Sequence, residues 1–174
     1  STIQKEIKGI EFLKYSGFEI TKKLSDCLLV YDDSCEEIFN DQEFVKLATS
    51  GRHRRINIIY VKHNLFQQSK WSRTIDLNTT HIILFKSLRD IQQIDYLGKQ
   101  LNCLEQLREA YKLATSEPYG HLIIDLDPKT VLRFASNLIG PEPSIFYLPV
   151  AKAFVTPLTN EKEARGYTAS LVQD

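Results

Sequence analysis

Two adjacent carboxylates, Asp32 and Asp33, directly follow the apolar run Cys27–Tyr31. An unbroken apolar run suits a strand that is buried on both faces, as in a parallel sheet between helices. In such sheets the chemistry sits at the carboxyl ends of the strands, where these acids would emerge. One acid there can hold the Mg²⁺ that bridges nucleotide phosphates, and a second can orient the attacking water. The pattern is typical of the Walker B acids of nucleotide hydrolysis.

The same acids also admit a structural interpretation. Ser34 and Glu37 have the spacing of a capping box, in which the serine begins a helix and the glutamate closes the box three residues later. Acids just before that helix would then be stabilised by its positive end. The residues themselves leave both interpretations open, and the surrounding elements must decide between them.

Further polar residues lie beside a second apolar run, Ile56–Val61, which predicts a buried strand. After this run come His63 and Asn64, which could sense a phosphate or the catalytic water, or could simply open a turn. Before it lies the densest basic cluster of the chain, which contains Arg52 and Arg54. That cluster is either functional or a solvated loop whose cations lie near the end of a helix.

A third acid competes for the metal. The run His121–Leu126 predicts another strand, and it contains Asp125. A metal-dependent nuclease would use several converging carboxylates on one or two cations. Asp32, Asp33 and Asp125 would be the ligands in that case.

The elements that position these residues follow an α/β pattern. A helix is predicted over 36–50 with Gly51 as its stop, a third strand over 81–85, and a long helical stripe from Asp90 to Tyr111. We therefore expect a mainly parallel sheet flanked by helices over residues 1–138. Several prolines after Asn137 predict an irregular arm or tail over residues 139–174.

Composition narrows the class of protein. The 174 residues are 43% hydrophobic and 25% charged, and 22 basic side chains balance 22 acidic ones, as in an ordinary globular domain without a strong overall field. No run is long enough for a membrane helix, and the first residues do not show the basic-then-apolar pattern of a signal peptide, so we expect none from this segment. The 3 cysteines, Cys27, Cys35 and Cys103, show no C-x-x-C pairing. This favours reduced thiols used for packing, and a cytoplasmic or nuclear setting.

The chain contains 0 methionines and begins at Ser1. A protein of this length usually carries a few methionines. We therefore expect the sequence to be a processed or excised segment of a longer polypeptide.

Taken in order, these segments resemble the DNA-packaging ATPases of poxviruses, other large eukaryotic DNA viruses and Polinton-like elements. Those proteins belong to the FtsK–HerA group of P-loop motors. The resemblance covers roughly residues 7–138. It rests on Cys27–Asp33, Gly51–His53, Ile56–Val61, His81–Phe85 and Pro118–Leu126.

The resemblance implies a role for each matching residue. Asp32 would help to hold Mg²⁺, and Asp33 would polarise the attacking water. Arg52 or Arg54 would face the nucleotide of a neighbouring subunit as an arginine finger. At the sensor position, where the family usually has glutamine, this chain has His63 followed by Asn64.

The resemblance also implies cofactors, partners and a place of action. ATP and Mg²⁺ would be the cofactors, and double-stranded DNA, a homo-oligomeric ring and a capsid or portal component would be the partners. The protein would act in the cytoplasm or nucleus of an infected or host cell, without a membrane.

One departure from the family is large. The motif G-x-x-x-x-G-K-[ST], whose backbone amides and lysine cradle phosphates, does not occur in these 174 residues. We therefore expect a P-loop core that lacks its phosphate-loop strand, active only with an upstream segment and inactive in isolation. The alternatives are a nucleotide-free, degenerate relative that serves as a binding or structural subunit, and the metal-dependent nuclease.

Overall fold

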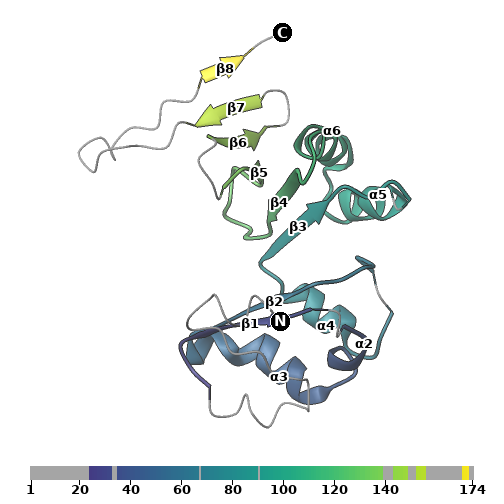
Figure 1. Cartoon of the computed structure of the whole chain (residues 1–174), viewed down its shortest axis with the longest axis vertical. Helices are drawn as coiled ribbons and strands as arrows, with labels where there is room; N and C mark the ends of the chain where they lie inside the picture. The colour runs from purple at the N-terminus through teal and green to yellow at the C-terminus, as the bar shows by residue number, and fades with distance from the viewer. Residues whose placement is uncertain are drawn as a thin grey trace, which may run out of the picture. The chain divides into compact units, whose positions relative to one another are not determined.

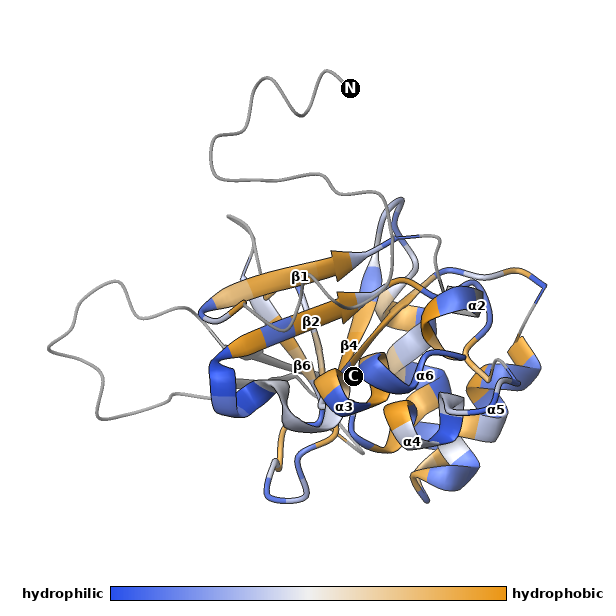
Figure 2. Cartoon of the chain, turned by 90° about the horizontal axis from the view of Figure 1, so that it is seen from below, coloured by the Kyte–Doolittle hydropathy of each residue, from blue (hydrophilic) through white to orange (hydrophobic). Residues whose placement is uncertain are grey.

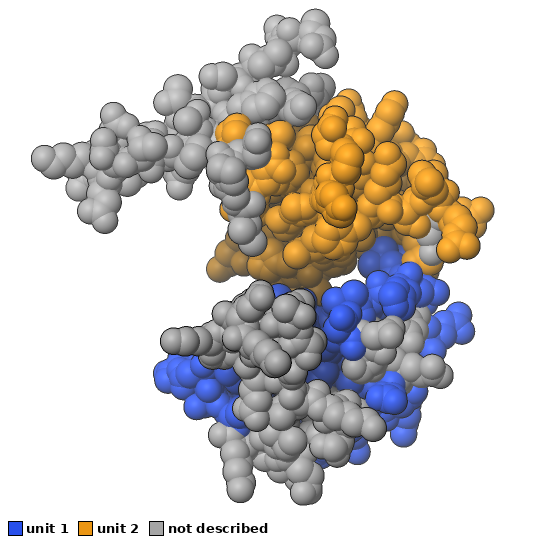
Figure 3. Space-filling model, viewed as in Figure 1, with its two compact units in different colours: residues 1–78 blue, residues 79–174 orange. Residues whose placement is uncertain are grey.

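The computed structural model of the chain describes residues 24–32, 35–66, 68–89, 91–138, 143–148, 152–155 and 170–172. The chain divides into two compact units, residues 1–78 and 79–174 (Figure 3). The sequence predicts a domain over residues 1–138 and an arm or tail over residues 139–174. The α/β class is confirmed, since helices and strands alternate from β1 to β4, before the chain continues through further strands (Figure 1). None of the helices in the described ranges is both long and apolar enough to cross a bilayer.

The first unit is built on a parallel strand pair. β1 (Cys27–Tyr31) and β2 (Ile56–Tyr60) pair in register from Cys27 opposite Ile56 to Tyr31 opposite Tyr60. The connection between them contains α2 (Cys35–Ile38), α3 (Gln42–Ser50) and the 3₁₀ helix η2 (Gly51–Arg54). α4 (Ser72–Leu77) follows β2. The expected parallel pairing of these two strands is therefore confirmed.

The predicted helix over 36–50 is interrupted between α2 and α3. The Asp41 carboxylate accepts a hydrogen bond from the Glu43 N–H at 2.8 Å, and Asp41 has the extended backbone of an N-cap. Such a side chain satisfies a backbone donor that the first turn of a helix leaves free, so it favours a new start over continuation. The proposed Ser34 cap lies outside the described residues.

Aromatic packing holds the first unit together. Phe39 and Phe44 are completely buried, with ring centroids 6.1 Å apart in an edge-to-face arrangement. Tyr31 at the end of β1 contacts Phe44 at 5.2 Å, and Tyr60 at the end of β2 contacts Phe39 at 5.4 Å. Edge-to-face pairs of this kind stabilise a fold by more than the burial of their apolar surface alone. One face of the strand pair is thus fixed to α2 and α3.

The opposite face of this strand pair is apolar but exposed. Leu28 is 55% exposed, Val30 60% and Ile59 47%. Colouring by hydropathy shows β1 as largely orange, although two of its 5 side chains, Leu28 and Val30, are exposed (Figure 2). The prediction that β1 is buried on both faces is therefore wrong for this structure.

The second unit contains an antiparallel sheet. Its strands are β3 (His81–Phe85), β4 (His121–Asp125), β5 (Phe134–Ser136), β6 (Ser144–Tyr147), β7 (Lys152–Val155) and β8 (Ser170–Val172). They pair in sequence order, and every pairing is antiparallel.

This arrangement corrects two expectations. The sheet is not mainly parallel. Short connections join β4 to β5, β5 to β6 and β6 to β7, and such connections favour antiparallel pairing, whereas parallel strands need a long crossover. The connection from β3 to β4 is long and contains α5 and α6, yet this pair is antiparallel as well. The segment predicted to be an irregular tail contributes β6, β7 and β8. The prolines that suggested a tail fall between these strands in the sequence, where a missing N–H costs the ladder nothing.

The predicted helical stripe over 90–111 forms two helices, α5 (Ile91–Gln100) and α6 (Leu104–Ala114). Asn102 has a positive φ of 55°. The Cys103 N–H donates to the Gly98 carbonyl at 2.9 Å, and the Asn102 N–H donates to the Lys99 carbonyl at 3.2 Å. These two bonds form a Schellman motif, which ends the first helix and turns the chain into the second.

Gly98 allows α5 and α6 to approach each other closely. A Cβ at this position would lie 2.8 Å from the Leu104 Cα, which is backbone and cannot move aside. A Cβ at Gly51 would lie no closer than 3.5 Å to its neighbours. The two glycines therefore differ in what they tolerate.

We predict that Gly98→Ala lowers the free energy of unfolding by about 1–3 kcal/mol, because the added methyl forces the helix pair apart. Gly51→Ala is the matched control, and we expect it to be neutral or to stabilise by up to ~1 kcal/mol through the unfolded chain. Urea denaturation followed by circular dichroism measures both. Equal destabilisation by the two substitutions would contradict the assigned close approach.

Candidate functional site

Asp32 lies at the carboxyl edge of the β1–β2 pair. It directly follows Tyr31, whose carbonyl accepts a hydrogen bond from the Val61 N–H at 2.9 Å, so the two strands end side by side. The Asp32 side chain is exposed. Asp33 lies outside the described residues. The structure thus places one of the two predicted acids where a parallel sheet presents its chemistry.

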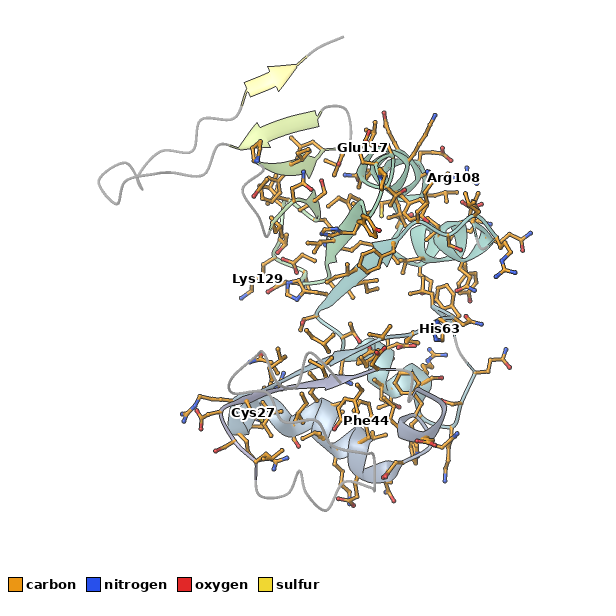
Figure 4. All side chains as sticks on the ribbon, viewed as in Figure 1. Cys27, Phe44, His63, Arg108, Glu117 and Lys129 are labelled. Carbon is orange, nitrogen blue, oxygen red and sulfur yellow. The ribbon has the colours of Figure 1, made fainter. Side chains whose placement is uncertain are left out.

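His63 and Asn64 follow β2 at the same edge. Figure 4 shows His63 at the opposite end of the strand pair from Cys27, with which β1 begins. The Asn64 side-chain oxygen accepts a hydrogen bond from the Phe66 N–H at 2.9 Å. This is an Asx turn, so Asn64 has the structural role that the sequence left open. His63 is exposed beside it.

Lys62 also lies at this edge, although no sequence motif marks it. Its ammonium lies 2.9 Å and 3.1 Å from the two Asp76 carboxylate oxygens and donates to the Leu65 carbonyl at 3.0 Å. It also lies 5.0 Å from the centroid of the Phe39 ring, and its side chain is 10% exposed. Lys62 therefore fixes the turn that carries His63. Its partner is set by the packing of α4, which no local pattern reveals.

Arg52 and Arg54 lie at the other edge. Both belong to η2, which leads into the amino end of β2, so the length of the strands separates them from Asp32. Five strand residues span roughly 16 Å. Arg52 is exposed, and the Arg54 guanidinium donates to the Leu24 carbonyl at 3.4 Å. The structure does not bring these arginines to the acid of their own chain.

Burial controls the ionisation of the aromatic residue next to the acid. Desolvation raises the pKa of Tyr31 to about 12, with smaller contributions from the negative forms of Cys27 and Asp41. The Tyr31 hydroxyl therefore stays neutral at physiological pH. Asp32 consequently follows a residue that brings no charge to the edge.

The cysteines behave as packing residues in the described part of the chain. Cys27 and Cys103 are free thiols of intermediate exposure, and Cys27 packs against the first unit's core. Burial raises the pKa of the Cys103 thiol, which disfavours the reactive thiolate. The Cys35 side chain lies outside the described set.

Asp125 has a local structural explanation. Its Oδ1 accepts the Asp127 N–H at 2.8 Å, and its Oδ2 accepts the Thr130 hydroxyl at 2.7 Å. These bonds, and more weakly the charges of His81 and Arg133, hold the pKa of Asp125 below its ordinary value. The carboxylate thus closes the turn between β4 and β5, and its geometry lends no support to a metal-ligand role.

The side chains at the Asp32 edge suit a metal site that is shared with substrate phosphates better than a site built from protein ligands alone. Within the described ranges, no three His, Cys, Asp or Glu side chains group in a way that could hold a metal ion. Mg²⁺ is commonly held by one or two carboxylates together with substrate phosphates and waters. The edge at Asp32 fits that shared arrangement and not an all-protein cage.

Comparison with known proteins adds no assignment. The chain matches no protein-family model, no curated protein and no solved structure.

We predict that Thr130→Val raises the pKa of Asp125 toward 3.8, because one of the two hydrogen bonds to its carboxylate is lost. With the folded pKa below the unfolded one, ionised Asp125 stabilises the fold above about pH 4, and this contribution is lost as the pH falls. The variant should therefore lose less stability on acidification. Carboxyl ¹³C shifts measure the pKa, and Thr130→Ser, which keeps the hydroxyl, is the control. An unchanged titration in Thr130→Val would show that the hydrogen bond has no such effect.

Proposed function

We propose that this chain is the carboxyl-terminal portion of an ATP-driven motor that packages or translocates double-stranded DNA, of the FtsK–HerA type. The observation that carries the proposal is the in-register parallel pairing of β1 and β2. It brings Asp32 and the Lys62–Asn64 turn to one edge of a sheet, as Walker B and sensor residues require. The sequence order of acids, basic cluster and second strand supports the same class of motor.

Among the described residues, β1 and β2 pair with no third strand, and this supports a further segment that joins their sheet. Parallel sheets occur almost only with both faces covered, and two strands alone are marginal in water. Here Leu28, Val30 and Ile59 form an exposed apolar face. A segment that carries the phosphate-loop strand would extend this sheet and supply the amides and lysine that the chain lacks.

In the proposed motor each residue has one task. Bound ATP with Mg²⁺ supplies the phosphoryl chemistry. Asp32 holds the cation, Asp33 orients and polarises the attacking water, and His63 senses the phosphate from the neighbouring strand end. Lys62 keeps His63 in place through its ion pair with Asp76.

In this proposal, Arg52 and Arg54 act between the subunits of an assembly. Because η2 lies at the far edge of the strand pair, Arg52 and Arg54 are unsuited to the nucleotide of their own chain. In a homo-oligomeric ring this edge can face the nucleotide of the next subunit. An exposed Arg52 supports that use, and a capsid or portal component would then be the ring's docking partner.

A nucleotide-free, degenerate relative is the second candidate. The Asx turn at Asn64 favours it, since a side chain used to shape a turn is less available to a phosphate. The coding sequence upstream of Ser1 separates the two candidates. An in-frame G-x-x-x-x-G-K-[ST] supports the motor, and a start codon directly before Ser1 supports the nucleotide-free subunit.

We predict that Asp33→Asn, in a polypeptide that joins this chain to a phosphate-loop segment, lowers ATP turnover by roughly 10²- to 10⁴-fold while nucleotide binding persists. Asp32→Asn should weaken Mg²⁺-dependent nucleotide binding as well. Phosphate release and equilibrium binding of a fluorescent nucleotide measure the two effects. Glu109→Gln, at an exposed position of α6, is the control, and undiminished turnover in Asp33→Asn would refute the assignment.

We further predict that Arg52→Ala subunits regain turnover when mixed with Asp33→Asn subunits, because each can supply what the other lacks at a shared interface. Either variant alone should be inactive in the assembled state. Measurement of turnover against mixing ratio tests this, with Lys129→Ala mixtures as the control. Failure of the mixture, with both variants assembled, would argue against a role in trans.

A further inference from the structure

One end of the β3–β4 pair carries aromatic side chains that are largely exposed. Tyr119 is 94% exposed and Phe85 is 63% exposed. Phe85 pairs across the strands with His121, and their ring centroids lie 5.7 Å apart. The Tyr119 carbonyl lies 3.3 Å from the His121 Nδ1. Large exposed rings gathered at one place mark an interaction surface.

The backbone on both sides of this surface is held in place. The Tyr111 hydroxyl accepts the Ser87 N–H at 2.8 Å and donates to the Phe85 carbonyl at 3.1 Å, which fixes the start of the loop after β3. Tyr119 has a positive φ of 62°, and the Gly120 N–H closes its turn on the Glu117 carbonyl at 3.0 Å. The rings are therefore presented at a low entropic cost.

Gly120 makes that turn possible. A Cβ at this position would lie 2.5 Å from the Ala114 carbonyl oxygen, so the chain passes close behind the end of α6. The exposure of Tyr119 is thus a product of a tight backbone turn.

Positive charge lies beside the rings. Lys86 and Arg89 are exposed on the loop after β3, and neither forms an ion pair or hydrogen bond with another described residue. Glu117 is the acid within the segments 85–89 and 116–121. The combination of exposed rings and cations without a partner among the described residues complements a nucleic-acid strand.

We propose that Phe85, Tyr119 and His121, together with Lys86 and Arg89, bind single-stranded nucleic acid. Exposed rings stack on the faces of unpaired bases, and the two cations contact the backbone phosphates. A duplex keeps its bases stacked on each other and offers these rings little. A small molecule would need a concave site that buries most of its surface, which rings this exposed do not form. The proposal does not rest on the proposed motor function.

The test measures, by fluorescence anisotropy, how a fluorescein-labelled 15-nucleotide oligothymidine binds to the 174-residue chain. We expect Tyr119→Ala to weaken binding by roughly 5- to 100-fold, and Tyr119→Phe, which keeps a stacking ring, to restore it. The double variant Lys86→Ala, Arg89→Ala should lower the slope of log affinity against log salt by about 1.4, since each phosphate contact on a single strand contributes about 0.7.

Matched controls lie in the same unit. Tyr96 is a partly exposed aromatic residue of α5, and Lys129 is an exposed cation at the other end of β4. Tyr96→Ala and Lys129→Ala should bind like the unaltered chain, and far-ultraviolet circular dichroism confirms that every variant is folded.

Three results would overturn the proposal. These are no binding of the oligonucleotide by the unaltered chain at 50 mM salt (about the low end of ordinary assays), equal losses in the control variants, and equally tight binding of a 15-base-pair duplex. The first result would leave the surface to a protein partner. Undiminished ATP turnover in Asp33→Asn, with oligonucleotide binding intact, would count against the motor alone.

Discussion

In-register pairing of β1 with β2 is the constraint on which the candidate site depends. Two parallel strands that begin together also end together, so the residues after each strand share one edge. The aromatic contacts of Tyr31 and Tyr60 with Phe44 and Phe39 hold that register from beneath. A slip of either strand by one residue would turn the tyrosine of that strand to the opposite face and shift Asp32 relative to the turn after β2.

The two edges of the β1–β2 pair in the first unit, one at Asp32 and one at η2, carry different functional groups. One edge presents an acid, a histidine and a lysine fixed by its ion pair, and the other presents the basic cluster. Chemistry that needs both sets must bring together two copies of the unit or a further segment. This division links the proposed ATPase activity to assembly, without any change within a single chain.

Much of this arrangement could be predicted from the sequence. Short apolar runs gave β1, β2, β3 and β4 nearly to the residue, and the chain order gave the parallel pair. Sheet direction in the second unit was not predictable from the runs, because a continuous apolar strand looks alike in parallel and antiparallel sheets. The strands within residues 143–172 were not predicted, because the prolines that lie between them in the sequence indicated an irregular segment.

Single side chains account for the remaining differences. A helical stripe continues across residues 90–111, yet Asn102 adopts the left-handed conformation that ends one helix and begins another. Asp41 divides the earlier helix in the same way, through a bond to one backbone N–H. The Lys62–Asp76 pair joins residues from different elements, so only the folded chain shows that the lysine belongs to the site.

The basic cluster is tied to the beginning of the first strand. The Asp26 N–H donates to the Arg54 carbonyl at 3.0 Å, the Arg54 guanidinium donates to the Leu24 carbonyl at 3.4 Å, and Arg55 pairs with the Asp26 carboxylate. A force that displaces η2 must therefore break these bonds or draw the start of β1 with it. Since a strand is stiff along its length, such a displacement would travel through β1 to the acid at its far end. A displacement of η2 by contact with a neighbouring subunit would therefore also change the position of Asp32.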